Sequence, residues 1–75
     1  MSPRLPTTTP RVTARALERA GFSYHHTRGS HRYYFHTDNK RMVAVPFHPG
    51  DIKRGTLRAI IRQAGLTVQE FMDFC

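Results

Sequence analysis

Three short segments rich in aromatic and β-branched side chains follow one another closely between residues 22 and 45. They span residues 22–28, 31–36 and 41–45. Such a composition is typical of β-strands. The links between them are the Gly29-Ser30 turn and a polar loop over residues 37–40, and links this short favour antiparallel neighbours. Pro46 should end the third strand because proline has no N–H to donate to a sheet. The pattern therefore predicts a three-stranded antiparallel meander.

Segments with helical signals flank these strands. Thr9 is a good N-cap residue and Pro10 suits a first helical turn, so a helix should begin there. Thr67 and Glu70 form a capping-box pattern, which predicts a short helix near the C-terminus. Between them, apolar residues at helical spacing predict a further helix. The three expected helices span residues 10–20, 54–64 and 68–73.

The two longer helices each have a single apolar face, so both should cover the same face of the sheet. The expected fold is therefore α+β, with a helix, a three-stranded antiparallel sheet, a second helix and a short C-terminal helix. This layout resembles the double-stranded-RNA-binding fold. With 75 residues the chain holds one domain at most, which we place at residues 10–75, after a flexible tail over residues 1–9.

The charge balance points to a polyanionic partner. The chain has 12 Lys and Arg residues against five Asp and Glu residues, for a formal charge of +7. The basic residues are spread along most of the sequence, which is the footprint of a nucleic-acid-binding domain. A domain this small has a thin core. We therefore expect no bound cofactor, and any chemistry should sit on an open surface.

The sequence also indicates where the chain works. Cys75 is the one cysteine, so no disulfide forms within the chain, as suits a reducing cytoplasm. The sequence has no long apolar run, and neither a membrane span nor a secretory signal is expected. Five histidines without cysteine partners or a helical His-x-x-x-His pair predict no metal site.

Adjacent residues on a strand face opposite sides of the sheet. We therefore expect His25 and His26 to point apart, which argues against joint binding of an ion. For the same reason, one of Tyr33 and Tyr34 should be in the core and the other free to stack on a base. The sequence does not decide which of the two tyrosines is buried.

The segment Gly29-Ser30-His31 is a candidate for catalysis. Glycine permits a sharp turn, and the histidine then begins a strand, which is a rigid place to hold a ring. A histidine side chain gives or takes a proton near neutral pH. RNA carries its own nucleophile, the 2′-hydroxyl, so a histidine with nearby Lys or Arg suffices for cleavage without a metal. Taken alone, a histidine beside a turn is more often an ordinary surface residue.

A second candidate lies at the start of the helix over residues 54–64. Lys53 and Arg54 stand where the backbone N–H groups of a helix favour phosphate. Arg58 lies four residues after Arg54 and extends the basic side of this helix. Contacts of this kind supply affinity for nucleic acid that is independent of sequence. The alternative is a solvated helix face.

Taken together, these motifs resemble those of the HicA mRNA interferase toxins. The matching stretches are Gly29-Ser30-His31, Val43-Ala44-Val45-Pro46-Phe47-His48, Lys53-Arg54-Gly55-Thr56-Leu57 and Ile61-Arg62-Gln63-Ala64-Gly65-Leu66. The resemblance implies a double-stranded-RNA-binding type of fold, a toxin that cleaves mRNA, and a HicB-type antitoxin as partner. It places the catalytic role on His31. The residues expected to bind RNA are Gly29, Ser30, Arg32, Lys53, Arg54 and Arg58.

One position departs from the family pattern. Many members have a second histidine directly after the first, where this chain has Arg32. Arg32 would bind phosphate instead, and the second proton carrier would be water, His48 or His36. Two further functions stay open: a non-catalytic RNA-binding domain of the same fold, in which His31 is dispensable, and, ranked last, a DNA-binding accessory domain. A homodimer formed through a free strand edge is also compatible with the sequence.

Overall fold

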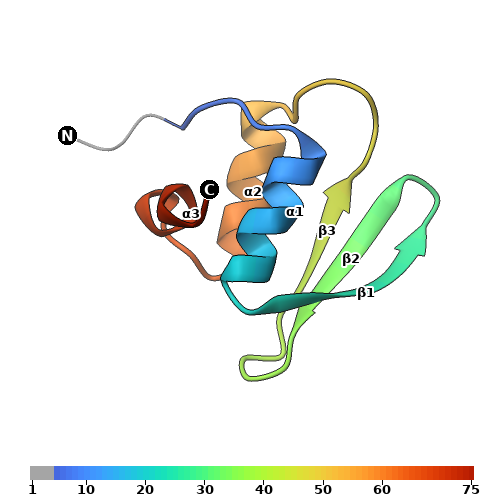
Figure 1. Ribbon diagram of the computed structural model, residues 1–75, viewed down its shortest axis with the longest axis vertical. Coiled ribbons are helices and arrows are strands. Elements are labelled where there is room, and N and C mark those ends of the chain that lie inside the picture. Colours follow the sequence, from blue (N-terminus) through green and yellow to red (C-terminus); the bar gives the residue numbers. More distant parts are fainter. Residues whose placement is uncertain (1–4) are drawn as a thin grey trace.

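The computed structural model describes residues 5–75 and shows the elements in the predicted order (Figure 1). The elements are α1 (Pro10–Arg19), β1 (Phe22–Arg28), β2 (His31–His36), β3 (Met42–Pro46), α2 (Arg54–Gln63) and α3 (Val68–Phe74). Every bound lies within one residue of its predicted position. The predicted α+β fold is therefore confirmed. None of the helices between residues 5 and 75 combines the length and apolar character needed to cross a membrane.

The helix starts follow from the residues that cap them. The Thr9 hydroxyl accepts a hydrogen bond from the Val12 N–H at 3.2 Å at the start of α1. At α3, the Thr67 hydroxyl accepts from the Glu70 N–H at 3.1 Å, and the Glu70 carboxylate accepts from the Thr67 N–H at 2.8 Å. Each cap satisfies backbone donors that have no partner within the helix.

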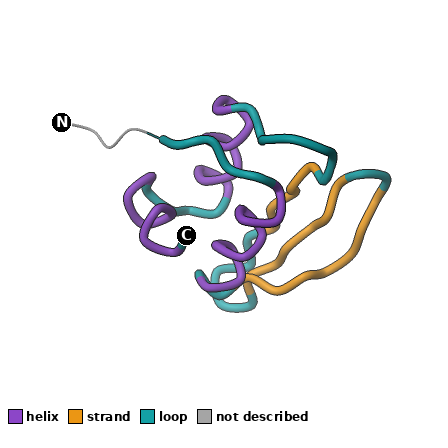
Figure 2. The backbone as a smooth tube through the Cα atoms, turned by 45° about the horizontal axis from the view of Figure 1, so that its top comes forward, coloured by secondary structure: helices purple, strands orange, loops and turns teal. Residues whose placement is uncertain are grey.

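The sheet has the order β1-β2-β3, with antiparallel pairing throughout. Figure 2 shows α1 and α2 on the same side of the sheet, as predicted. The core forms between these layers. From the sheet it takes Phe22, Tyr34, Val43 and Val45, and from the helices Leu17, Leu57, Ile60, Ile61 and Phe71. Among the described residues, no helix covers the opposite face of the sheet.

A β-bulge in β1 overturns one expectation. The register between β1 and β2 shifts between Tyr24 and His26, so His25 has no partner in β2. The strict alternation of side chains breaks there. The His25 and His26 rings consequently contact each other, with 2.8 Å between their Nδ1 atoms. The expectation that these two histidines point apart was wrong, because a bulge depends on strand pairing and not on local composition.

The tyrosine pair behaves as predicted. Tyr34 is 4% exposed and belongs to the core. Tyr33 is half-buried on the other face of the sheet, where its ring stacks on His26 with 4.5 Å between the ring centroids. The free tyrosine is therefore Tyr33, and it already has a stacking partner within the sheet.

The N-terminal segment is packed in the part that the structure describes. Of the predicted tail over residues 1–9, residues 1–4 lie outside the described residues. Leu5 is 1% exposed, and the Thr8 carbonyl accepts a hydrogen bond from the Ile52 N–H at 2.8 Å. The Thr8 and Thr13 hydroxyls are hydrogen-bonded at 2.8 Å in a buried position. Residues 5–9 thus lie against the domain instead of forming a loose tail.

Candidate active site

The Gly29-Ser30 turn places His31 at the first residue of β2. Gly29 has a φ of +60°, and Ser30 does not share a positive φ. A positive φ at the first loop residue alone is the pattern of a type II′ hairpin turn, which favours glycine there. His31 follows on the rigid strand and is exposed. The turn therefore presents the imidazole ring to solvent from a fixed backbone.

A hydrogen bond connects this turn to the segment that follows β3. The Phe47 N–H donates to the Ser30 carbonyl oxygen at 2.6 Å, one residue beyond the pairing of His31 with Pro46. Next along the chain, His48 faces the same hollow as His31, a cavity of about 500 Å³. We call it the histidine hollow. It is lined by His31, Pro46, His48, Pro49, Asp51, Ile52, Lys53 and Thr56.

The N-terminus of α2 forms the basic side of the histidine hollow. Lys53 is the N-cap residue of α2, and its side chain makes no capping hydrogen bond. The first turn of the helix contains no acidic residue. Backbone N–H groups at such a helix start, together with the positive end of the helix dipole, attract phosphate. Lys53 adds a full charge, and the Thr56 hydroxyl adds a donor.

The other predicted RNA-binding residues are placed less centrally. Gly29 and Ser30 shape the turn but do not line the histidine hollow. The Arg54 Nε donates to the Leu5 carbonyl oxygen at 3.3 Å, so this side chain helps to hold the N-terminal segment. Arg58 is exposed one turn further along α2, away from the hollow. Of the three residues predicted at the start of α2, Lys53, Arg54 and Arg58, only Lys53 lines the same cavity as His31.

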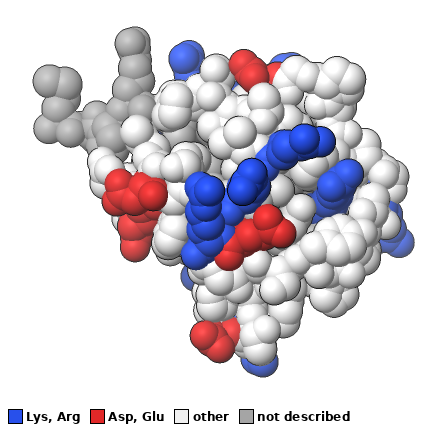
Figure 3. Space-filling view, viewed as in Figure 1, with Lys and Arg blue, Asp and Glu red and all other residues white. Residues whose placement is uncertain are grey.

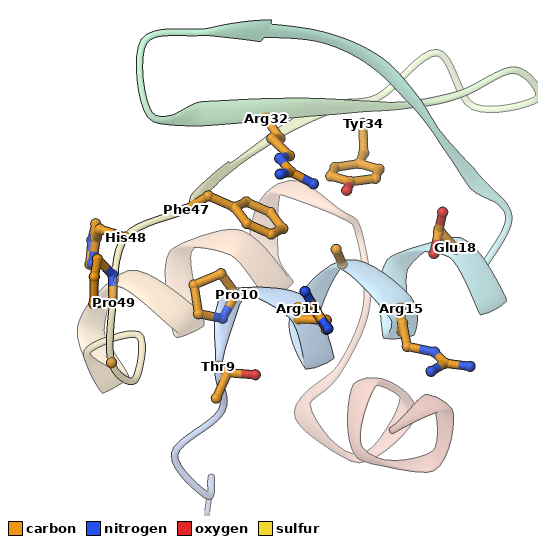
Figure 4. Close-up of a pocket in the computed structure, with 12 residues that line it drawn as sticks. Thr9, Pro10, Arg11, Arg15, Glu18, Arg32, Tyr34, Phe47, His48 and Pro49 are labelled. Atoms are coloured by element: carbon orange, nitrogen blue, oxygen red, sulfur yellow. The ribbon is translucent and has the colours of Figure 1, made fainter.

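Arg32 points to the helix-covered side of β2, away from its neighbour His31. Its guanidinium lies over the Phe47 ring, 3.9 Å from the ring centroid. It lines a second cavity, of about 580 Å³, between α1 and β2 (Figure 4). We call it the arginine groove. It is defined by Arg11, Arg15, Glu18, Arg32, Tyr34 and Phe47.

His36 lies at the far end of β2 from His31. The two lie five residue steps apart along the strand, about 16 Å at roughly 3.3 Å per residue. The His36 ring packs edge-on against Phe22 with 5.0 Å between centroids. Of the two histidines considered as a second proton carrier, only His48 shares a cavity with His31.

Two residues of the histidine hollow were missed by the sequence reasoning. Thr56 stands in the Lys53–Leu57 motif, three residues after the N-cap, where a first-turn hydroxyl comes close to any phosphate bound at the helix start. That position was a usable signal. Asp51 lines the same cavity, and nothing in its sequence neighbourhood indicated it. Among residues 5–75, no group of three or more His, Cys, Asp or Glu side chains is arranged to hold a metal ion.

Several basic side chains lie close together on the face of the molecule that holds α1. Figure 3 shows a row of Lys and Arg side chains across the face that holds α1, with acidic groups beside it. The fold and site thus define a small basic α+β domain with two histidines at the phosphate-attracting start of a helix. Proton transfer next to a bound phosphodiester is the chemistry that this set of groups suits.

Comparison with known families agrees with that class. A family model described as the HicA toxin of bacterial toxin-antitoxin matches residues 11–66, which is more than half of the chain. The chain therefore belongs to the HicA toxin family. Membership implies a toxin role and a cognate antitoxin as partner. No curated protein matches the chain.

Proposed function

We propose that this toxin is a metal-independent endoribonuclease that cleaves mRNA, with His31 as its catalytic residue. The observation that carries the proposal is the histidine hollow. There, two exposed histidines from different segments share a cavity with Lys53 and the start of α2. Cleavage through the 2′-hydroxyl involves one proton removed and one proton donated, and the hollow contains two histidines that could carry out these transfers.

The reaction proceeds through the substrate's own nucleophile. One histidine accepts the proton of the 2′-hydroxyl while the 2′-oxygen attacks phosphorus. The 5′-oxygen of the next nucleotide leaves, and the second histidine gives it a proton. The products are a 2′,3′-cyclic phosphate and a 5′-hydroxyl end. Lys53 and the N–H groups of α2 stabilise the charge that develops on the non-bridging oxygens.

His48 is the second proton carrier in this proposal. The family's usual second histidine is absent, since Arg32 follows His31 and points to the other side of the strand. The strand is regularly paired at these two residues, so their side chains point to opposite faces and cannot both reach one phosphate. His48 enters the same cavity from the segment after β3. The proton-transfer pair is thus completed across the fold, and not within the Gly-Ser-His motif.

The partners follow from the same proposal. A HicB-type antitoxin would neutralise this chain by covering the histidine hollow, because the catalytic groups there are open to solvent. The substrate, mRNA, places the activity in the cytoplasm. A homodimer through a free sheet edge remains part of the proposal, because β1 and β3 are the edge strands.

The competing function is a non-catalytic RNA-binding domain. It predicts a His31 that is buried or separated from other proton carriers. The exposed position of His31 and its shared cavity with His48 favour the enzyme. The phosphate-attracting start of α2 is common to both functions and does not separate them.

Expression in cells tests the proposal. The wild type, His31→Ala and His25→Ala are induced from a tightly repressed promoter, and growth and mRNA integrity are followed. His25 is an exposed histidine outside the hollow and serves as the matched control. We expect growth arrest and mRNA loss with the wild type and His25→Ala but not with His31→Ala. Equal behaviour of the wild type and His31→Ala would contradict a catalytic His31.

A further inference from the structure

The arginine groove adjoins the histidine hollow. His48 and Pro49 line both cavities. Figure 4 shows His48 and Pro49 at one end of the groove and Glu18 at the other, with Arg32 and Tyr34 reaching from β2 toward α1. The space between α1 and β2 is therefore next to any phosphate that lies at His31 and His48.

The groove is lined by unengaged positive charge. Arg11 and Arg15 lie four residues apart on α1, so they share one side of the helix. Three other arginines hold the fold: Arg19, Arg41 and Arg54 donate to backbone carbonyl oxygens. Within residues 5–75, Arg11 and Arg15 donate no hydrogen bond of this kind. Figure 4 shows the Arg15 guanidinium turned outward from the groove, so it is available to a phosphate at the rim of the groove on the α1 side.

The middle of the groove offers a flat surface. The Arg32 guanidinium lies 3.9 Å from the centroid of the Phe47 ring, and both groups are planar. Bases of single-stranded RNA stack on aromatic rings and on arginine planes. The aromatic ring of Tyr34 forms part of the same wall.

The end of the groove away from His48 carries a negative charge. Glu18 supplies a carboxylate next to the Tyr34 hydroxyl (Figure 4). Burial and then the Glu18 charge raise the pKa of Tyr34, against an opposing effect of Arg32. The hydroxyl therefore stays protonated at neutral pH. A carboxylate here would repel an acidic peptide but accepts hydrogen bonds from the amino group of a base.

We propose that the arginine groove is a nucleotide subsite for single-stranded RNA, next to the bond that is cut. Arg11 and Arg15 contact the phosphate, the base stacks on the Arg32–Phe47 pair, and Glu18 accepts from an amino group on the base. The inference rests on the proposed function, because it takes the position of the cut bond from the histidine hollow. A cavity of about 580 Å³ suits a small-molecule-sized group, so one unpaired nucleotide enters and a duplex does not.

RNA binding by a protein that cannot cut tests the subsite. All variants are made in the protein that carries His31→Ala, so that the RNA is not cut. The probes are four five-nucleotide RNAs with uridine at the outer positions and each of the four bases in turn at the central position. Fluorescence anisotropy gives the Kd at several salt concentrations. The groove variants are Arg11→Gln, Arg15→Gln and Glu18→Ala. The control is Lys40→Gln, which removes the same charge from the exposed hairpin loop at the other end of the sheet.

Each groove arginine variant should weaken binding. It should also make the plot of the logarithm of the association constant against the logarithm of the salt concentration less steep by about 0.7, the value for one phosphate contact on a single strand. Lys40→Gln should leave the slope unchanged. Uridine lacks an amino group, so we expect the other central bases to bind more tightly by about fivefold or more. Glu18→Ala should reduce that preference while tightening the all-uridine RNA.

Two outcomes would overturn the subsite: equal slopes for Lys40→Gln and the groove variants, or a base preference that Glu18→Ala leaves intact. Either result leaves the cleavage proposal standing if the wild type still cuts RNA. Conversely, groove-dependent binding by a wild type that cuts no RNA rejects the cleavage proposal and keeps the groove as a binding site for single strands.

Discussion

The backbone N–H of Phe47 donates to the carbonyl oxygen of Ser30 at 2.6 Å, and this contact joins the two segments that carry His31 and His48. Ser30 immediately precedes His31, and Phe47 immediately precedes His48. Together with the pairing of His31 with Pro46, this hydrogen bond holds both histidines at the same cavity. The position of the proposed acid–base pair depends on a backbone contact, not on the Ser30 hydroxyl.

This arrangement predicts a pH profile with two limbs. If one histidine accepts and the other donates a proton, the rate of RNA cleavage should fall on both sides of an optimum. His48→Ala should lower the rate by about 10²–10⁴-fold and remove one limb. The double variant His31→Ala/His48→Ala should cleave RNA only slightly more slowly than the slower of the two single variants. The reason is that the rate effects of substitutions are not additive for residues that act as a unit. A two-limbed profile in His48→Ala would contradict the pairing.

The turn before His31 requires glycine for its backbone conformation. An alanine Cβ at Gly29 would meet no atom within 4 Å, but the φ of +60° remains. Gly29→Ala should therefore destabilise the fold by about 1 kcal/mol through backbone strain alone. Gly55 lies in α2, has no positive φ and is equally open, so Gly55→Ala should stabilise by about 0.5–1 kcal/mol. Urea unfolding measures both, and the same sign for the two variants would contradict this account.

Leu5 should contribute to stability as a core residue does. It is 1% exposed and packs in the core cluster. Leu5→Ala should cost about 2–5 kcal/mol, as expected for a large buried side chain. Thr7→Ala, at an exposed position in the same segment, should stay within about 0.5 kcal/mol. A neutral Leu5→Ala would show that residues 5–9 are loose in solution, as the sequence suggested.

Tyr34 should make the fold sensitive to alkali. Burial raises the pKa of its hydroxyl in the folded protein above the ordinary value of 10.0. The folded state then keeps the proton to a higher pH than the unfolded state. The contribution of this group to the free energy of unfolding is fully present below about pH 10 and is lost as the pH rises through the raised pKa. Thermal melts at pH 7 and above pH 10 should show a smaller alkaline loss for Tyr34→Phe than for the wild type; an equal loss would contradict the shift.

Local signals explain why the element bounds were predictable. Thr9 with Pro10, and Thr67 with Glu70, each act within one helical turn, so their effect is readable without knowing the fold. The same holds for Gly29-Ser30, where a two-residue link allows only a tight hairpin. The role of His31 came instead from resemblance to a family and not from spacing.

Features that depend on pairing between distant segments were not predictable. The bulge at His25 arises from the register of β1 on β2. The burial of Leu5 depends on the bridge between Thr8 and Ile52. Likewise, the sequence left water, His48 and His36 as candidates for the second proton carrier. The pairing of β2 with β3 and the Phe47–Ser30 bond bring His48 to the same cavity as His31.

Cleavage of a defined RNA by purified protein in the presence of EDTA tests the catalytic role of His31. The substrate carries one cleavable ribonucleotide in a 2′-deoxy strand, and its products are separated on a gel. We expect the wild type to cut at that nucleotide and to leave a 2′,3′-cyclic phosphate, whereas folded His31→Ala leaves the strand intact. Equal cutting by His31→Ala, or cutting by the wild type at 2′-deoxy positions, would contradict a mechanism in which His31 serves the substrate's own 2′-hydroxyl.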